Sequence, residues 1–251
     1  MKNYGEKLIV LREVEKPKIS VVIPTYNEEK YLEDTLISIK SQNFKHPYEI
    51  IVSDSNSKDK TIEIAKKYAD KIVITKKRGI AIGRNLGAKY ANGEIILFVD
   101  ADTILLPNTL NEIYKEIRKN NVSLVTSPYL SREYSAQYNF YLVFSYFYIK
   151  SLYLFRKTSQ LPGFFIACKK KDFLKIGGFN EKLKVLEDFD FSERMSKLGK
   201  ISFVESTFVL TSSRRIRKWG LKAIPKYLTT YLYYIIFRND KLGKKFWKPI
   251  R

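Results

Sequence analysis

The sequence predicts an α/β protein built on one mainly parallel sheet, and three observations carry that prediction. Apolar strand-like runs alternate with helix-like segments through the first half of the chain, an order typical of a parallel sheet covered by helices on both faces. Polar and acidic residues directly follow three of these runs. The 251 residues fit one large domain, and no internal repeat or low-complexity linker divides them.

The elements are expected in a simple order along the chain. Strands are expected at Ile19–Pro24, Glu49–Ser53, Lys71–Thr75 and Glu94–Val99, with helices between them at Glu28–Ser41, Asp59–Ala69 and Ile80–Ala91. The second half is less regular. Pro107 suits the first turn of a helix that runs to about Asn120. A helix is also expected at Glu187–Leu198 and a last strand at Thr207–Thr211.

The net charge of +20 is the unusual feature of the composition. Such a field attracts polyanions: nucleic acid, anionic lipid headgroups or phosphorylated substrates. Residues 214–251 hold 12 Lys and Arg against one acid, a net +11 of the total. The single cysteine, Cys168, excludes an intramolecular disulfide, and residues 1–18 show no apolar targeting segment. A cytoplasmic protein is therefore expected.

Acids two residues apart follow the last strand of the first half. Alternate side chains of a strand point the same way, so Asp100 and Asp102 can converge just past the strand end. Two carboxylates with open positions suit Mg²⁺ or Mn²⁺, whose other ligands would be water and phosphate oxygens. The alternative is that both are loop acids ahead of the helix that starts near Pro107.

Five short segments together resemble a known enzyme family. They are Ile23–Glu29, Val52–Thr61, Gly83–Gly87 leading to Asp100-Ala101-Asp102, Gly177-Gly178-Phe179, and Glu187-Asp188-Phe189-Asp190. In this order they resemble the family-2 glycosyltransferases, inverting enzymes with the Rossmann-like GT-A fold. The resemblance runs from Ile19 to about Lys200. It implies a single GT-A-like domain that uses a UDP- or GDP-sugar and a divalent metal.

The resemblance also implies how the donor nucleotide is held. Pro24, Tyr26 and Glu28 would wall the base and ribose, and Asp54 would accept hydrogen bonds from either. The commonest family pattern has a second acid after Asp54, whereas this chain has Ser55, which leaves the base open. Asp54 also suits turn formation and capping of the next helix.

Three arginines are candidates for the phosphates. Arg84 would reach the nucleotide or an acidic neighbour, and the alternative is a solvated helix charge. Arg214 and Arg215 follow the last expected strand. Because guanidinium groups bind phosphate in a bidentate manner, this pair could clamp the diphosphate or a lipid phosphate. Equally, it could begin a surface helix.

Transfer to a hydroxyl requires a general base, and Asp188 is the candidate. Glu187 would bind the acceptor or orient that base. Both could instead be acids that favour a helix start. The neighbouring Leu186, Phe189 and Phe191 predict an apolar setting that raises a carboxyl pKa.

Residues 212–251 are expected to form a helical, basic, aromatic tail after a domain spanning 1–211. Basic residues around the apolar run Tyr227–Phe237 are typical of helices at a membrane interface. We therefore expect peripheral contact with an anionic membrane at its cytoplasmic face, and a lipid-linked saccharide as acceptor. Tyr138–Phe155 is too interrupted to predict a membrane span, and a core helix is its alternative.

Two other functions fit part of the pattern. A glycosyl synthase acting on a polyprenyl phosphate needs no base, because its acceptor is already an anion, so the Glu187-Asp188 pair argues against it. A non-catalytic nucleic-acid-binding protein explains the charge, but acids at three strand ends would repel a phosphate backbone. Nucleic acid is therefore not the expected partner.

Overall fold

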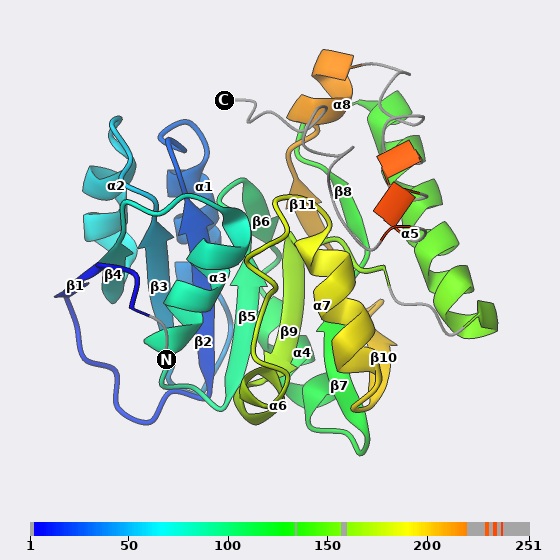
Figure 1. Cartoon of the computed structure of the whole chain (residues 1–251), viewed down its shortest axis with the longest axis horizontal. Coiled ribbons are helices and arrows are strands. Elements are labelled where there is room, and N and C mark those ends of the chain that lie inside the picture. Colours follow the sequence, from blue (N-terminus) through cyan, green and yellow to red (C-terminus); the bar gives the residue numbers. More distant parts are fainter. Residues whose placement is uncertain are drawn as a thin grey trace.

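A central sheet of eight strands organises the molecule, with helices on both faces (Figure 1). This computed structural model describes residues 3–133, 135–156 and 160–219, together with 229, 230, 233, 234 and 237. The strand order is β1-β4-β3-β2-β5-β9-β7-β10. The chain is thus an α/β protein of the predicted class.

The first half of the sheet is parallel, as predicted. Its strands are β2 (Ile19–Thr25), β3 (Tyr48–Asp54), β4 (Lys71–Ile74) and β5 (Ile95–Val99). A short edge strand, β1 (Lys7–Val10), pairs antiparallel with β4.

The second half of the sheet contains strands that the sequence analysis did not predict. β9 (Phe165–Lys169) lies antiparallel between β5 and β7 (Val122–Thr126), and β10 (Lys200–Phe203) runs parallel to β7. A second sheet of three strands joins β6 (Thr103–Leu105), β11 (Val209–Thr211) and β8 (Tyr129–Ser131). The expected strand at Thr207–Thr211 is therefore the central strand of this smaller sheet.

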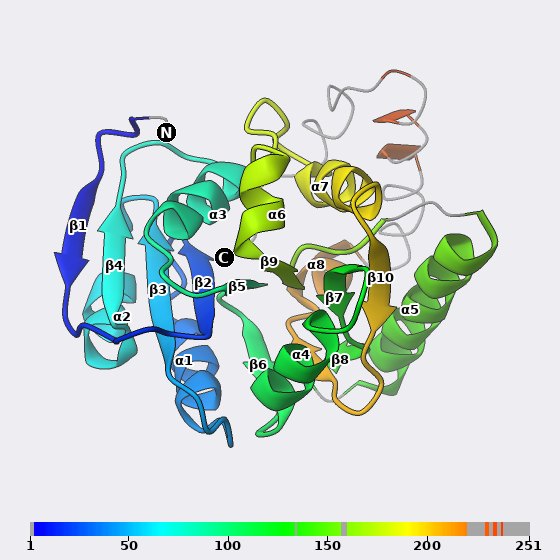
Figure 2. The ribbon, with the colours of Figure 1, turned by 90° about the horizontal axis from the view of Figure 1, so that it is seen from below.

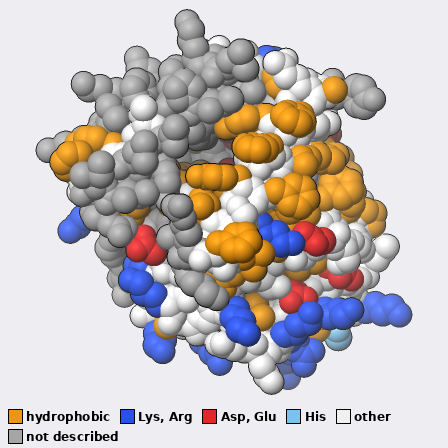
Figure 3. Space-filling model, turned by 90° about the vertical axis from the view of Figure 1, so that its right-hand side faces the viewer, with side chains coloured by type: hydrophobic (Ala, Val, Ile, Leu, Met, Phe, Trp, Pro, Cys, Tyr) orange, Lys and Arg blue, Asp and Glu red, His pale blue; other side chains and the backbone are white. Residues whose placement is uncertain are grey.

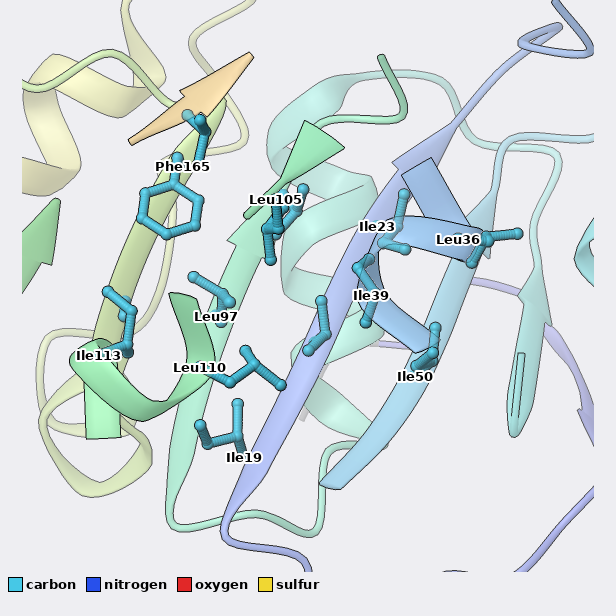
Figure 4. Packing of buried hydrophobic residues seen from close by; sticks show 14 of the residues in the cluster. Ile19, Ile23, Leu36, Ile39, Ile50, Leu97, Leu105, Leu110, Ile113 and Phe165 are labelled. Atoms are coloured by element: carbon cyan, nitrogen blue, oxygen red, sulfur yellow. The ribbon is translucent and has the colours of Figure 1, made fainter. Parts of the chain in front are cut away.

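The alternation of side chains divides the core into two layers. Val21 and Ile23 face one layer and Val22 faces the other. Three helices lie on one side of the sheet, below it in Figure 2: α1 (Leu32–Lys40), α2 (Thr61–Tyr68) and α4 (Thr109–Ile117). Three others lie on the opposite side, above the sheet in that view: α3 (Ile80–Lys89), α6 (Lys170–Lys175) and α7 (Glu187–Ser196). Figure 4 shows the first layer, in which Leu36 and Ile39 of α1 pack against the sheet.

Two predicted helices begin later than expected, for a local reason. The Asn27 backbone is left-handed (φ 54°), and the Glu28 N–H donates to Thr61 Oγ1 at 2.7 Å. Asp59 in turn accepts from the Thr61 N–H. These contacts hold both helix-preceding segments as loops, so α1 begins at Leu32 and α2 at Thr61.

The two remaining helices, α5 and α8, lie at the periphery. α5 (Ala136–Arg156) is the long helix at the right of Figure 1, and it packs against β8. Among the described residues, no helix has the length and apolar character to cross a bilayer. α8 (Arg214–Trp219) begins the basic tail. Most of residues 220–251, including the charged Lys241, Lys244 and Lys245, lies outside the described residues.

Candidate active site

Polar loops meet where the parallel strands end. Thr25 and Asp54 are register partners at the ends of β2 and β3, and Asp100 follows β5. The carboxyl ends of parallel strands form the usual ligand crevice of such sheets. The structure thus brings the predicted donor-binding loops to one edge.

Asp54 ties two of these loops together. Its side chain is buried and accepts from the Thr25 hydroxyl at 2.8 Å and from the Ser57 hydroxyl at 2.6 Å. The Ser57 N–H donates to the other carboxylate oxygen at 2.7 Å. Ser57 Oγ also accepts from the Asn27 N–H. Asp54 therefore has the turn-forming contacts of the alternative interpretation, and its contact with a nucleotide stays a prediction.

Arg214 bridges two acids from distant parts of the sequence. Its guanidinium donates to both carboxylate oxygens of Glu28, at 2.8 and 3.2 Å, and lies 3.1 Å from Asp102 Oδ2. Pro24 belongs to the end of β2, and the Arg78 guanidinium carbon lies 4.5 Å from the Tyr26 ring centroid. The Arg215 side chain lies outside the described residues.

Arg84 occupies the centre of a second group of acids. Its side chain is 1% exposed and donates to Glu187 Oε1 at 2.9 Å, Asp100 Oδ1 at 3.0 Å and the Gly163 carbonyl at 2.8 Å. Its burial excludes the solvated helix charge that the sequence left open. Arg84 instead contacts acidic neighbours, which is one of the two contacts predicted for it from the sequence. It thereby links the end of β5 to the start of α7.

Glu187 and Asp188 begin α7 in different surroundings. Glu187 is buried, whereas Asp188 is partly exposed and accepts from the Gly163 N–H at 2.7 Å. Leu186, just before them, adopts a left-handed backbone (φ 60°). Such a conformation is rare for a bulky residue and is a feature of constrained functional sites.

Both carboxyl groups titrate abnormally. Burial, reinforced by the charge of Asp188, raises the pKa of Glu187 to about 8, although Arg84 opposes the shift. Burial also raises the pKa of Asp188, while Arg84 and the Gly163 N–H counteract it. This agrees with the apolar setting predicted from Leu186, Phe189 and Phe191. A carboxyl group with a raised pKa accepts protons more readily, as a general base requires.

The pKa of Glu187 predicts a pH-dependent stability. Its folded pKa of about 8 exceeds the ordinary unfolded value. The stabilising contribution is therefore complete below pH ~4.3 and is lost as the pH rises through 8. We expect Glu187→Gln to remove this loss, so that the free energy of unfolding of the variant rises relative to wild type by more than ~1 kcal/mol between pH 5 and 8. Urea unfolding at several pH values measures it.

The matched control for this prediction is Glu63→Gln, because Glu63 is exposed on α2. That variant should follow the wild-type pH dependence throughout. Parallel curves for wild type and Glu187→Gln would contradict the assignment, since Arg84, Asp100 and Asp188 alone would then account for the titration of this cluster.

Asp100 and Asp102 suit a divalent cation by their chemistry. Both offer oxygen ligands at the end of β5, and the Asp100 side chain is 28% exposed. In the described part of the chain, no three His, Cys, Asp or Glu side chains gather closely enough to hold a metal. Mg²⁺ commonly uses one or two carboxylates and takes its other ligands from substrate phosphates and water. The pair fits that incomplete type of site.

Known proteins resemble this chain over much of its length. The model of glycosyl transferase family 2 matches residues 20–177. The chain belongs to this family. Among curated family relatives, the poly(ribitol-phosphate) β-N-acetylglucosaminyltransferase TarS of Staphylococcus aureus is 39% identical over 102 residues, or 38% of this chain and 18% of TarS. The uncharacterized glycosyltransferase MJ1057 of Methanocaldococcus jannaschii is 33% identical over 196 residues, or 71% and 64%.

Solved structures confirm the GT-A-like fold of this family-2 chain. TarS residues 1–349 in complex with UDP superpose with a TM-score of 0.60 at 24% identity, covering 80% of this chain and 62% of that one. The mannosyltransferase PcManGT of Pyrobaculum calidifontis, in complex with GDP-Man and Mn²⁺, gives 0.68 at 22% identity, covering 90% and 66%. The chain spans less than two thirds of TarS and of MJ1057.

Two contributors to this family-2 site were missed from the sequence. Gly163 carries no side chain, yet its N–H donates to Asp188 and its carbonyl accepts from Arg84. Glu133 accepts from the Ser213 N–H at 2.8 Å and from the Ser212 hydroxyl at 2.8 Å, which anchors the segment that carries Arg214. Although burial opposes it, these bonds lower the pKa of Glu133 to about 2. No local motif indicated either contact.

Proposed function

We propose that this chain is an inverting glycosyltransferase that moves a sugar from a nucleotide-diphosphate donor to a hydroxyl of a saccharide acceptor. The observation that carries the proposal is that Asp188, partly exposed and with a raised pKa, lies next to Glu187, which Arg84 joins to Asp100 at the end of β5. Membership of family 2 supports it. Asp188 would take the proton of the attacking hydroxyl, and Glu187 would hold Arg84 and orient the start of α7.

The donor would lie over the ends of β2, β3 and β5. Pro24, Tyr26 and Asp54 would contact the base and ribose, while Asp100 and Asp102 would hold Mg²⁺ or Mn²⁺. When bound, that cation would supply positive charge for the departing diphosphate. TarS is known with UDP-GlcNAc, and PcManGT with GDP-Man and Mn²⁺, which supports a UDP- or GDP-sugar as donor.

Arg214 would complete the donor site from the opposite side. It lies against Glu28 and Asp102, so it can pass from these carboxylates to a diphosphate without a large displacement. Arg215 would assist it. The acceptor would be a saccharide linked to a lipid at the cytoplasmic face of the membrane.

Metal dependence tests the donor site directly. We expect Mn²⁺ with a UDP- or GDP-sugar to raise the melting temperature, because ligands that bind only the native state stabilise it. Asp102→Ala should keep the fold and lose both this shift and transfer. The matched control is Asp172→Ala on α6, which should respond as wild type. Full activity in the presence of a chelator would exclude the metal at Asp100 and Asp102.

A further inference from the structure

The outer face of α5 is mainly apolar. Phe140, Phe144 and Phe155 are 76%, 63% and 85% exposed, and Phe147, Tyr148 and Leu154 are also exposed. At about 100° per residue these six side chains occupy roughly a third of the helix circumference. Figure 3 shows the resulting patch of apolar side chains on this side of the molecule.

The inner face of α5 is already satisfied by the protein. Leu142 and Tyr146 are buried in the core, and Ile149 and Tyr153 pack against it. A surface helix normally turns polar side chains outward. Continuous exposed apolar patches of this kind mark interaction sites. The exposed aromatic face of α5 is therefore a candidate surface for binding a partner.

The shape of this surface suits a fluid partner. A cavity of about 510 Å³ opens beside the helix, lined by Tyr129, Val143 and Phe147 with Lys150 and Glu205. Protruding rings beside a hollow require a rigid partner to match both features, whereas acyl chains adapt to them. α5 has 21 residues, which corresponds to about 32 Å of helix and is long enough to lie along a surface.

The positive charge of the chain favours a lipid partner over a second copy of the chain. Residues 136–157 contain three basic residues and no acid, and the whole chain carries +20. Two copies would meet with like charges, which opposes association. An anionic bilayer attracts both the helix and the basic C-terminal segment. Phe and Tyr rings favour the boundary between headgroups and acyl chains.

We propose that α5 is an interfacial membrane-binding helix whose aromatic face enters an anionic bilayer while its axis stays parallel to the surface. This contact is additional to the basic tail and lies on a different part of the chain. α5 precedes β9 in the chain, and Gly163, which lies between them in sequence, touches Asp188 and Arg84. The helix would thus hold the proposed base close to a lipid-linked acceptor. This role of the helix in catalysis rests on the proposed function, whereas its contact with the membrane does not.

The test measures binding to vesicles without donor or acceptor, so it is independent of catalysis. Full-length protein is floated with phosphatidylcholine vesicles containing phosphatidylglycerol, and with phosphatidylcholine alone. The variant Phe144→Ser/Phe147→Ser/Phe155→Ser should lower the partition coefficient at least ~10-fold. The matched control, Ile37→Ser/Leu174→Ser, changes exposed apolar residues on α1 and α6 and should bind as wild type.

A further variant and the possible outcomes of the binding experiment decide the proposal. Phe155→Glu alone, at the most exposed position, should weaken binding and preserve the melting temperature. Equal binding by wild type and the triple variant would overturn the proposal, as would loss of binding only on charge reversal of Lys241, Lys244 and Lys245. A wild-type dimer that the triple variant converts to a monomer, with no vesicle binding by either, would assign the face to a second copy instead.

Discussion

We expect Asp188→Asn to lower transfer to a hydroxyl acceptor by ~10²-fold or more, as loss of a general base does. Asparagine nearly preserves the shape and can still accept the Gly163 N–H bond that holds this side chain. Its amide cannot take up a proton. Donor affinity should change little, because Asp100 and Asp102 belong to a different element. Single-turnover transfer and donor binding measure the two effects separately.

The control for this result is Asp190→Asn on the same helix, since Asp190 pairs with Arg194 rather than with the candidate base. It should leave transfer within a few-fold of wild type. Near-wild-type transfer by a folded Asp188→Asn variant would refute the assigned base. It would favour a glycosyl synthase with a lipid phosphate as acceptor, whose nucleophile carries a negative charge already.

We expect Arg84→Met to cost ~3–5 kcal/mol of stability near pH 8, the range for breaking a buried ion pair by removing one partner. Arg84 is the cation between Glu187 and Asp100. Without it, Glu187 keeps a buried carboxylate that must either stay charged at high cost or bind a proton. The cost should therefore be smaller at pH 6. Chemical denaturation at both pH values measures it.

A double-mutant cycle distinguishes lost charge pairing from lost packing. Glu187→Gln should recover part of the stability in the Arg84→Met background, because it removes the unpaired charge. Arg84→Lys serves as the charge-preserving control and should lie between wild type and Arg84→Met, since lysine cannot form the same fork of hydrogen bonds. An Arg84→Met variant as stable as wild type at pH 8 would show that the carboxylates need no buried cation.

The parallel half of the fold was predictable because its signal is local. β2 to β5 are apolar runs bordered by polar residues. A helix follows each of β2, β3 and β4, and the short strand β6 separates β5 from α4. β9 could not be predicted in the same way. It is five residues long and lies between β5 and β7, so its place in the sheet depends on pairing with residues 42 to 74 positions earlier.

The site was predictable at the level of candidate residues and not at the level of their partners. The strand-end position of Asp100 and the helix start at Glu187 follow from local patterns. Their connection through Arg84 spans 103 positions, and the contact of Arg214 with Glu28 spans 186. Only the folded chain fixes such pairs. The predicted donor-binding roles all stay predictions: those of Pro24, Tyr26, Glu28, Asp54, Arg84, Asp100, Arg214 and Arg215.

Gly163 contributes to this site only through its backbone, so a comparison of side chains does not detect its contribution. It serves the candidate base with its N–H and the buried arginine with its carbonyl, and a Cβ there would lie 2.5 Å from Arg84 Nη2. An alanine scan would register only that collision. Replacing the Gly163 amide by an ester would instead delete one backbone donor to Asp188 and leave the other, the Phe189 N–H. Changes to the backbone at Gly163 would consequently alter the surroundings of the candidate base and of the buried arginine without replacing either side chain.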